Sequence, residues 1–306
     1  MTVATATSGG ESLDLFLRRL KLPSFVDHHE EVAAKAATEG WSFTQYLAYL
    51  AEVEITERER RRIERNLRQS ALPSEKTLGA LELSRLPRKV QSQIPHLSEG
   101  GFVERAENLL VFGLPGRGKS HVVCAIGHEL IVRGYRVLFR PAYSLVQTLL
   151  AAKNELMLEQ QLKRLDSFDV VVIDDIGYVQ QNREEMEVLF TFLAERYERR
   201  SVIITSNLVF SEWDRIFKDP MTTAAAIDRL VHHATILELT GSSFRSEAAQ
   251  RRNVAVPVTA GKTAKDTHPE PDAAATEAAS KPQKPERRAK RKKPRRRSPA
   301  RKDGEM

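Results

Sequence analysis

A glycine-rich turn that ends in Lys119 and Ser120 is the first group of residues that could do chemistry. It fits the pattern G-x-x-x-x-G-K-S, follows the apolar run LLVF and precedes the helical pattern SHVVCAIGHELIVRG. That context is typical of a phosphate-binding loop, because glycines let backbone N–H groups face a phosphate and the helix N-terminus adds partial positive charge. Lys119 is expected to reach the β and γ phosphates and Ser120 to ligate Mg²⁺; a chance glycine turn is the alternative. The predicted nucleotide contacts are Gly113, Leu114, Pro115, Gly116, Arg117, Gly118, Lys119, Ser120 and His121.

Two carboxylates end the second motif, VVVIDDIG, at residues 170–177. A buried strand that ends in Asp can bring a carboxylate to the Mg²⁺ that the loop serine holds. We therefore predict that Asp174 is the metal-side residue and that Asp175 orients or activates the attacking water. By itself the motif could be a strand-end turn with incidental acids, but the loop some 50 residues upstream favours an ATP and Mg²⁺ site.

Two further polar positions follow later in the chain. The apolar stretch SVIITSNL ends in Thr205, Ser206 and Asn207, which either serve the site or only cap a strand. Arg229 lies in the helical pattern AAAIDRLVHHA, where a surface pair with Asp228 is the bland alternative. The histidines at 28, 29, 232 and 233 have no metal-ligand partners at suitable spacing, so no metal other than Mg²⁺ is predicted.

Five short runs must supply the sheet that positions these residues: NLLVFG, RVLFR, DVVVIDD, SVIITSN and TILEL. Four are nearly continuous apolar runs, as expected for strands buried on both faces of a parallel sheet. Helical patterns follow all but the last. The fold class is therefore α/β over residues 99–250, with helices on both sides of the sheet.

The remaining sequence divides by composition into three parts. Residues 1–11 are polar and predicted to be disordered, and residues 12–98 carry helical patterns that predict a small all-α domain. Within it, residues 57–68 hold six Arg and three Glu. This helix is either a solvated surface with i,i+4 ion pairs or a contact for the DNA backbone. Residues 251–306 lack apolar residues that could form a core and are predicted to be a disordered Lys/Arg-rich tail.

Charge and cysteine content limit the function classes. The net charge is +7, but residues 281–306 alone carry +10, so the first 280 residues carry −3. A cationic tail without aromatic residues either aids solubility or binds phosphates without reading sequence. Cys124 is the one cysteine, which excludes an internal disulfide, and we expect it to be a small buried apolar residue. Without a secretory signal or a membrane-length apolar run, the expected location is cytoplasmic, with no membrane partner.

The wording of these motifs resembles the IstB-like ATP-binding proteins, helper ATPases of the AAA+ superfamily that insertion sequences encode beside their transposase. The likeness covers about residues 13–248, and YERRSVIITSNLVFSEW followed by DRLVHHA is its most specific part. Earlier stretches, LKLPSF and ERERRRIERNLRQSALPSEKTL, resemble that family's helical domain.

The resemblance implies a five-stranded parallel sheet in the order 5-1-4-3-2, Mg²⁺-dependent ATP hydrolysis stimulated by DNA and oligomerisation, and self-assembly on duplex DNA. It implies delivery of a target site to a partner transposase, with the helical domain contributing to DNA binding and to subunit packing. Asn207 resembles the sensor 1 residue that holds the lytic water, and Arg229 resembles an arginine finger that acts on a neighbouring subunit's nucleotide. The family's GESYR appears here as GSSFR, which makes Arg245 a candidate γ-phosphate contact.

One departure from the family keeps other functions open. The family often has Asp-Glu where this chain has Asp174 and Asp175, and the shorter carboxylate favours slow hydrolysis. A nucleotide-gated DNA-binding scaffold with little turnover is therefore an alternative. A DnaC-like helicase loader is the second, because such loaders share the nucleotide motifs.

Overall fold

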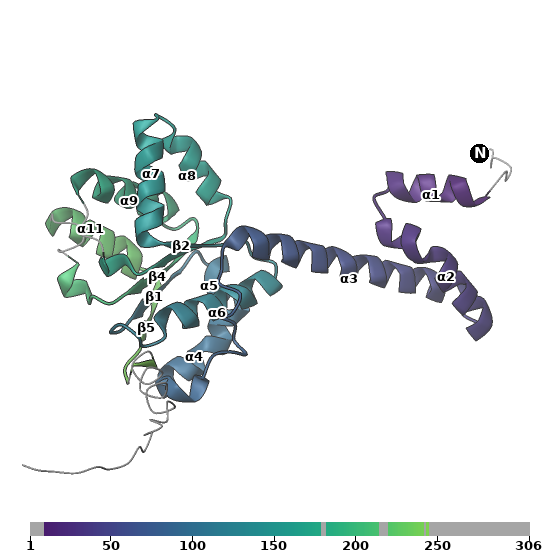
Figure 1. The fold of residues 1–306 in the computed structure, drawn as a ribbon, viewed down its shortest axis with the longest axis horizontal. Helices are drawn as coiled ribbons and strands as arrows, with labels where there is room; N and C mark the ends of the chain where they lie inside the picture. The colour runs from purple at the N-terminus through teal and green to yellow at the C-terminus, as the bar shows by residue number, and fades with distance from the viewer. Residues whose placement is uncertain (1–8, 179–181, 214–219, 242, 245–306) are drawn as a thin grey trace, which may run out of the picture. The chain divides into compact units, whose positions relative to one another are not determined.

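The sheet domain is built on five parallel strands. A computed structural model describes residues 9–178, 182–213, 220–241 and 243–244 of the 306. Its strands are β1 (Asn108–Phe112), β2 (Val137–Pro141), β3 (Val170–Asp174), β4 (Ser201–Ser206) and β5 (Ala234–Glu238). They lie in the order β2-β3-β4-β1-β5, and every neighbouring pair is parallel. This confirms the predicted order 5-1-4-3-2, and Figure 1 shows the sheet between its helices.

Successive strand residues point to opposite faces of the sheet, and each face has its own core. Leu110 and Phe112 of β1 pack in one apolar cluster, while Leu109 and Val111 pack in the other. The first face is covered by α7 (Ala142–Asn154), α8 (Leu158–Asp166), α9 (Arg183–Arg196) and α11 (Pro220–Val231), and the second by α6 (Lys119–Val132) and α4 (Arg88–Glu99). Burial on both faces explains why the strands are apolar runs without alternation.

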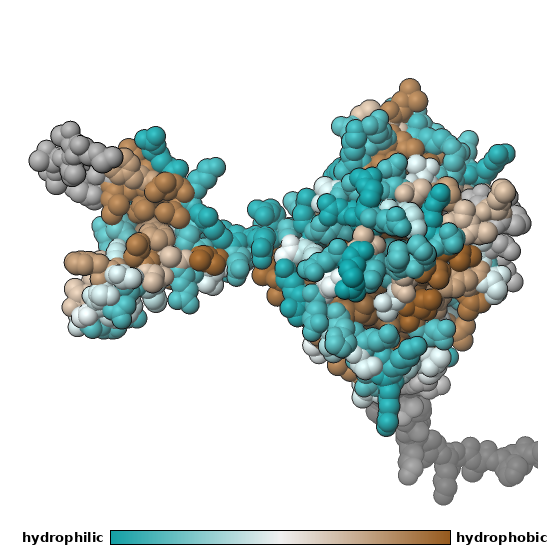
Figure 2. Space-filling view, turned by 180° about the vertical axis from the view of Figure 1, so that it is seen from behind, coloured by the Kyte–Doolittle hydropathy of each residue, from teal (hydrophilic) through white to brown (hydrophobic). Residues whose placement is uncertain are grey.

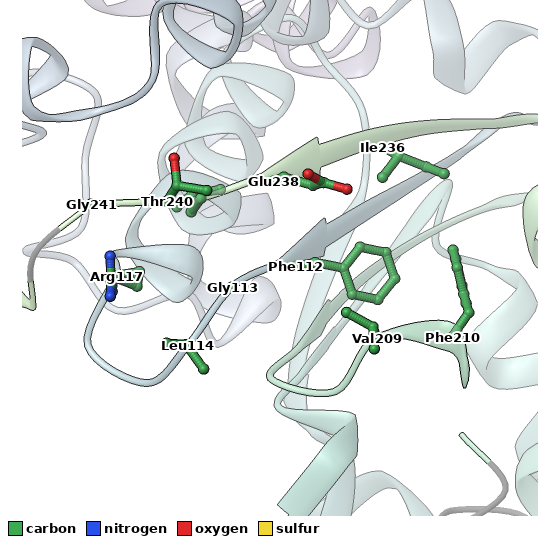
Figure 3. Close-up of a pocket in the computed structure, with 11 residues that line it drawn as sticks. Phe112, Gly113, Leu114, Arg117, Val209, Phe210, Ile236, Glu238, Thr240 and Gly241 are labelled. Atoms are coloured by element: carbon green, nitrogen blue, oxygen red, sulfur yellow. The ribbon is translucent and has the colours of Figure 1, made fainter. Parts of the chain in front are cut away.

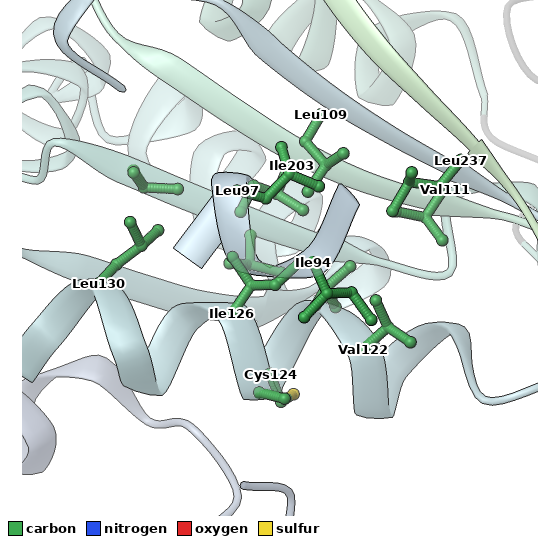
Figure 4. Packing of buried hydrophobic residues seen from close by; sticks show 14 of the residues in the cluster. Ile94, Leu97, Leu109, Val111, Val122, Cys124, Ile126, Leu130, Ile203 and Leu237 are labelled. Carbon is green, nitrogen blue, oxygen red and sulfur yellow. The ribbon is translucent and has the colours of Figure 1, made fainter. Parts of the chain in front are cut away.

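The core beneath α6 fixes the helix that follows the phosphate-binding loop. Figure 4 shows Leu109, Ile203 and Leu237 of β1, β4 and β5 facing helix side chains, which are Val122 and Ile126 of α6 and Ile94 of α4. Cys124 lies on α6 and is fully buried, as predicted, and this burial raises the pKa of its thiol to about 12. Burying a Leu or Ile side chain contributes roughly 1.5–3 kcal/mol, so this packing holds the start of α6 at the sheet edge.

Three helices precede the sheet domain: α1 (Gly9–Arg19), α2 (Pro23–Glu39) and α3 (Phe43–Ser70). Pro23 is at the first turn of α2, where its missing N–H costs nothing. The side chains of Ser42 and Gln45 form a capping box at the start of α3. Glu54 ties α3 to α2, because its carboxylate accepts hydrogen bonds from the Ser24 N–H at 2.8 Å and from Arg58 Nε at 2.6 Å.

The segment after α3 packs with the sheet. It contains the 3-10 helix η1 (Leu83–Arg85), then α4 and α5 (Gly101–Glu104). Leu81 and Ile94 belong to the cluster beneath the sheet, together with other residues of α4. Packing therefore assigns α4 to the sheet domain, whereas the sequence placed residues 12–98 in the helical domain. No helix among the described residues is both long and apolar enough to span a bilayer.

Candidate nucleotide site

The glycine-rich loop joins β1 to α6, as the sequence predicted. Gly113 has φ 154°, and a Cβ there would lie 2.5 Å from the carbonyl oxygen of Leu239, so only glycine fits beside the end of the sheet. Lys119 begins α6 and is 7% exposed. Its ammonium donates to the carbonyl oxygens of Gly113 at 2.7 Å and Leu114 at 3.3 Å. The loop thus brings a cation and the N-terminus of a 14-residue helix to one place.

Both carboxylates lie at the end of β3, next to β4. Asp174 Oδ1 accepts hydrogen bonds from Ser120 Oγ at 2.9 Å and from Thr205 Oγ1 at 2.6 Å. Asp175 follows with φ 66°, a left-handed conformation that is uncommon outside glycine. Its N–H donates to Thr205 Oγ1 at 2.8 Å. The predicted Ser120 and Asp174 pair therefore meets, 54 residues apart in sequence.

Asn207 lies directly after β4, against the turn that follows the carboxylates. A Cβ on Gly177 would overlap Asn207 Oδ1 and lie 2.9 Å from Leu208 Cγ, so a larger residue at this position of η2 (Ile176–Tyr178) would displace these side chains. The Asn207 Oδ1 atom is buried and has no hydrogen-bond partner among the described residues. The Asn207 side chain thus lies against the turn that follows Asp174 and Asp175, and its Oδ1 atom is available to accept a hydrogen bond.

A cavity of about 630 Å³ opens over the loop and α6. One wall is the stretch from Lys76 to Glu82, the other is the glycine-rich loop with Asp175, and Phe244 also lines it. The Phe244 N–H donates to the Gly116 carbonyl at 2.9 Å, and the Arg85 guanidinium lies 3.7 Å from the centre of its ring. The predicted members are Pro115, Gly116, Arg117, Gly118, Lys119, Ser120, His121 and Asp175.

Sequence patterns did not predict that Lys76, Ala80, Leu81, Glu82 and Phe244 line this cavity. His121 Nε2 contacts the Thr77 carbonyl at 3.2 Å and His128 Nε2 the Pro73 carbonyl at 3.0 Å, which fixes this wall on α6. Two histidines at helical spacing after the lysine were the available signal, but they do not say what they contact. Only the folded chain shows that contact.

A second cavity, also of about 630 Å³, lies on the other side of the loop. Figure 3 shows it between the ends of β1 and β5 and the turn at Val209 and Phe210. Leu114, predicted as a nucleotide contact, lines this second cavity and is 60% exposed. Arg117 lines both. The second cavity has a mainly apolar lining and, unlike the first, includes neither Lys119 nor Ser120.

Arg229 does not line the nucleotide cavity of its own chain. It lies in the last turn of α11, where its guanidinium is 4.8 Å from the centre of the Phe190 ring. Its Nη1 is buried and has no partner among the described residues. The alternative interpretation, a surface pair with Asp228, is not formed within the described part of the chain. Arg245 lies outside the described residues.

His232 and His233 do have an acidic neighbour, which the sequence spacing did not reveal. Glu198 Oε1 lies 4.0 Å from His232 Nδ1 and 3.9 Å from His233 Nε2, and all three side chains are exposed. Ligands that share one tetrahedral ion at bond lengths near 2.1 Å are separated by roughly 3.4 Å. His232 Nδ1 also contacts the Tyr197 hydroxyl at 2.9 Å. The group is an exposed cluster of one carboxylate and two imidazoles, and no ion is assigned to it.

Comparisons with known proteins found one matching family and several similar chains. The IstB-like ATP binding protein family matches residues 16–252. An insertion sequence ATP-binding protein of Sinorhizobium fredii is 43% identical over 78% of this chain and 80% of its own length. The insertion sequence IS21 ATP-binding protein of Pseudomonas aeruginosa is 37% identical over 79% of this chain and 91% of its own. The crystal structure of the DnaC helicase loader matches half of this chain with 20% identity and a TM-score of 0.42, covering 89% of the loader chain.

Proposed function

The chain belongs to the IstB-like ATP-binding proteins, and from this premise we propose that it is an AAA+ ATPase that assembles on duplex DNA and assists a transposase. The observation that carries the proposal is the contact between Ser120 and Asp174 beneath the glycine-rich loop. It joins the loop that holds phosphates to the carboxylate that holds a cation, as ATP chemistry requires.

The residues present fit Mg²⁺. Mg²⁺ prefers oxygen ligands, and Ser120 Oγ, which belongs to the lining of the cavity, lies 2.9 Å from Asp174 Oδ1. Bound there with ATP, the ion would neutralise charge on the β and γ phosphates. Lys119 is placed to exchange its contacts with the Gly113 and Leu114 carbonyls for phosphate oxygens. Asp175 and Asn207 flank the same turn and are proposed to orient the attacking water.

Arg229 is proposed to act on the nucleotide of a neighbouring subunit. Arg229 does not line the candidate cavity of its own chain, which supports a role on a neighbouring subunit. In that role its guanidinium would move away from the Phe190 ring. We expect Arg229→Ala to leave ATP binding by the single subunit unchanged and to lower turnover by about 10³-fold, as for other trans arginines. Arg105→Ala, which removes an exposed arginine paired with Glu107, is the matched control. Unchanged turnover in the Arg229 variant would exclude the finger role.

Basic residues of α3 and of the C-terminal segment are the candidates for DNA binding. Arg58, Arg60 and Arg61 of α3 pair with glutamates of the same helix, which favours the solvated interpretation of these three. Arg65 and Arg68 form no ion pair among the described residues and are the better candidates for phosphate contact. The basic tail lies outside the described residues. Deleting 281–306 should weaken DNA affinity and reduce its salt dependence; an unchanged salt slope argues against the tail.

The decisive experiment is electron microscopy of the protein with duplex DNA in ATP, in ADP and without nucleotide. We expect an ordered assembly that depends on ATP. Lys119→Ala should lower ATP affinity on the order of 100-fold and thereby abolish the assembly. Lys153→Ala, which changes a surface lysine paired with Glu187, should assemble normally. Wild-type assembly by the Lys119 variant without ATP would contradict the proposal.

Two alternatives have distinct readouts. Phosphate release at background in the presence of DNA would favour the scaffold with little turnover, for which Asp175 is the motivating residue. Capture of a replicative helicase rather than a transposase would favour a loader. The transposase gene beside the chain's own gene would be the simplest support for the transposition role.

A further inference from the structure

Thr205, a residue without an assigned role, contacts both carboxylate residues of the candidate site. It lies in β4, between β3 and β1, and is fully buried. Its hydroxyl oxygen is 2.6 Å from Asp174 Oδ1 and 2.8 Å from the Asp175 backbone nitrogen. A buried parallel strand favours valine or isoleucine at such a position, so the hydroxyl needs an explanation.

The donor and the acceptor of each hydrogen bond follow from the protons that the Asp175 N–H and the Thr205 hydroxyl carry. The Asp175 N–H can only donate, so Thr205 Oγ1 accepts from it, and the single hydroxyl proton is left for Asp174 Oδ1. Asp174 Oδ1 then receives two donated protons, one from Thr205 and one from Ser120. These two hydrogen bonds fix the rotation of the Asp174 carboxylate, and Oδ2 takes part in neither of them.

The second bond acts on the backbone. Asp175 has φ 66°, a conformation that costs a residue with a Cβ about 1 kcal/mol or more and persists only where surrounding contacts enforce it. The bond from its N–H to Thr205 is such a contact. It sets the direction in which the Asp175 side chain leaves the turn.

We propose that Thr205 is a positioning residue that holds the metal-side carboxylate and the water-activating residue in one fixed relation. The inference rests on the proposed ATP hydrolysis and deepens it. Thr205 is not among the residues that line the cavity beside the loop, so it acts through its contacts with Asp174 and Asp175. The branched Cβ restricts the side chain to few rotamers within a strand, which keeps the hydroxyl between its two partners.

The test compares Thr205→Val, which keeps the shape and removes the hydroxyl, with Thr205→Ser, which keeps the hydroxyl. Ser201→Ala is the matched control, because Ser201 is a fully buried hydroxyl at the other end of the same strand. Three quantities are measured in the full chain: kcat and KM for ATP, the gain in ATP affinity on adding Mg²⁺, and amide hydrogen exchange at Asp175 without nucleotide.

We expect Thr205→Val to lower kcat by about 10–100-fold, the range for removed partners of metal ligands, with KM changed far less. The Mg²⁺-dependent gain in affinity should fall, Mg²⁺-free ATP affinity should stay, and the Asp175 amide should exchange faster. Thr205→Ser should recover most of kcat, and Ser201→Ala should resemble the wild type in all three readouts.

Two results overturn the proposal: wild-type kcat in Thr205→Val, or equal losses in the Val and Ser variants. Failure of the proposed function looks different, since the wild-type protein itself would then release no phosphate. Amide exchange and the Mg²⁺-dependent affinity need no turnover, so in that case an undiminished affinity gain or unchanged Asp175 exchange in Thr205→Val still refutes the positioning role.

Discussion

The three N-terminal helices and the sheet domain distribute their apolar side chains in opposite ways. Among the side chains of α1–α3 that the structure describes, the buried apolar residues are Leu17, Val32, Ala36 and Leu50. Other apolar side chains of the same region are exposed: Leu20 directly after α1, and Leu13, Leu15, Phe16, Phe43, Leu47, Tyr49 and Ile55 in the helices. Figure 2 shows apolar surface over this region. The central strands of the sheet, in contrast, are buried on both faces.

This difference in apolar burial indicates which contacts stabilise each region. The sheet domain buries its apolar surface within itself, so its fold is determined by its own contacts. The helices bury little and rely on caps and on the polar tie between Glu54, Ser24 and Arg58. An exposed apolar face of this kind is characteristic of surfaces that bind another molecule, in line with the proposed subunit packing.

The largest effect should follow from Arg196, which is 2% exposed in the sheet domain. Its guanidinium donates to the carbonyl oxygens of Leu165, Phe168, Asp169 and Ser201, and burial lowers its pKa to about 10, so it stays charged at neutral pH. Arg196→Met should cost about 3–5 kcal/mol by leaving these carbonyls unpaired. Urea unfolding measures this; a loss no larger than that of the exposed control Arg199→Met would contradict the account.

The next effect compares one leucine from each region. Leu110 in β1 is fully buried, whereas Leu47 in α3 is 58% exposed. Leu110→Ala should lower the free energy of unfolding by about 2–5 kcal/mol and Leu47→Ala by less than about 1 kcal/mol. Both are measured by urea titration followed by circular dichroism. Equal losses would mean that Leu47 is covered in solution and would break the comparison.

A smaller, pH-dependent effect should be confined to the helices. Burial by itself raises the pKa of Glu54, but hydrogen bonds from Arg58 and Ser24 outweigh it, so the pKa lies below its ordinary value of 4.5. The stabilising contribution is therefore complete above pH 4.5 and is lost as the pH falls through the lowered pKa. Glu54→Gln should cost about 1–2 kcal/mol at neutral pH and remove this acid sensitivity. Acid unfolding of α1–α3 that is the same in both proteins would refute this role.

The smallest effect should come from Phe43, which is 95% exposed at the start of α3. Phe43→Ser should change the free energy of unfolding by no more than about 0.5 kcal/mol, measured by the same titration at low protein concentration. A loss above 1 kcal/mol would show that this ring is buried in the protein in solution.

Local patterns were sufficient for much of the site. The spacing of Gly113, Lys119 and Ser120 and the strand ending in Asp174 and Asp175 predicted the loop and its carboxylate partner, because short-range signals encode a strand, a turn and a helix start. Patterns also predicted the two-sided burial of the strands. They did not predict that α4 joins the core of the sheet domain, since an amphipathic helix does not specify which apolar surface it covers.

By itself, the sequence determined the phosphate-binding loop, the α/β fold class and the membership of the IstB-like family. The tertiary structure decided which distant polar groups meet: Thr205 with both aspartates, Gly177 with Asn207, Glu198 with the two histidines, and the Lys76–Glu82 stretch with the nucleotide cavity. The physical reason is that hydrogen bonding and close packing depend on separations of a few ångströms, which parallel strand register and helix docking set between residues far apart in the chain.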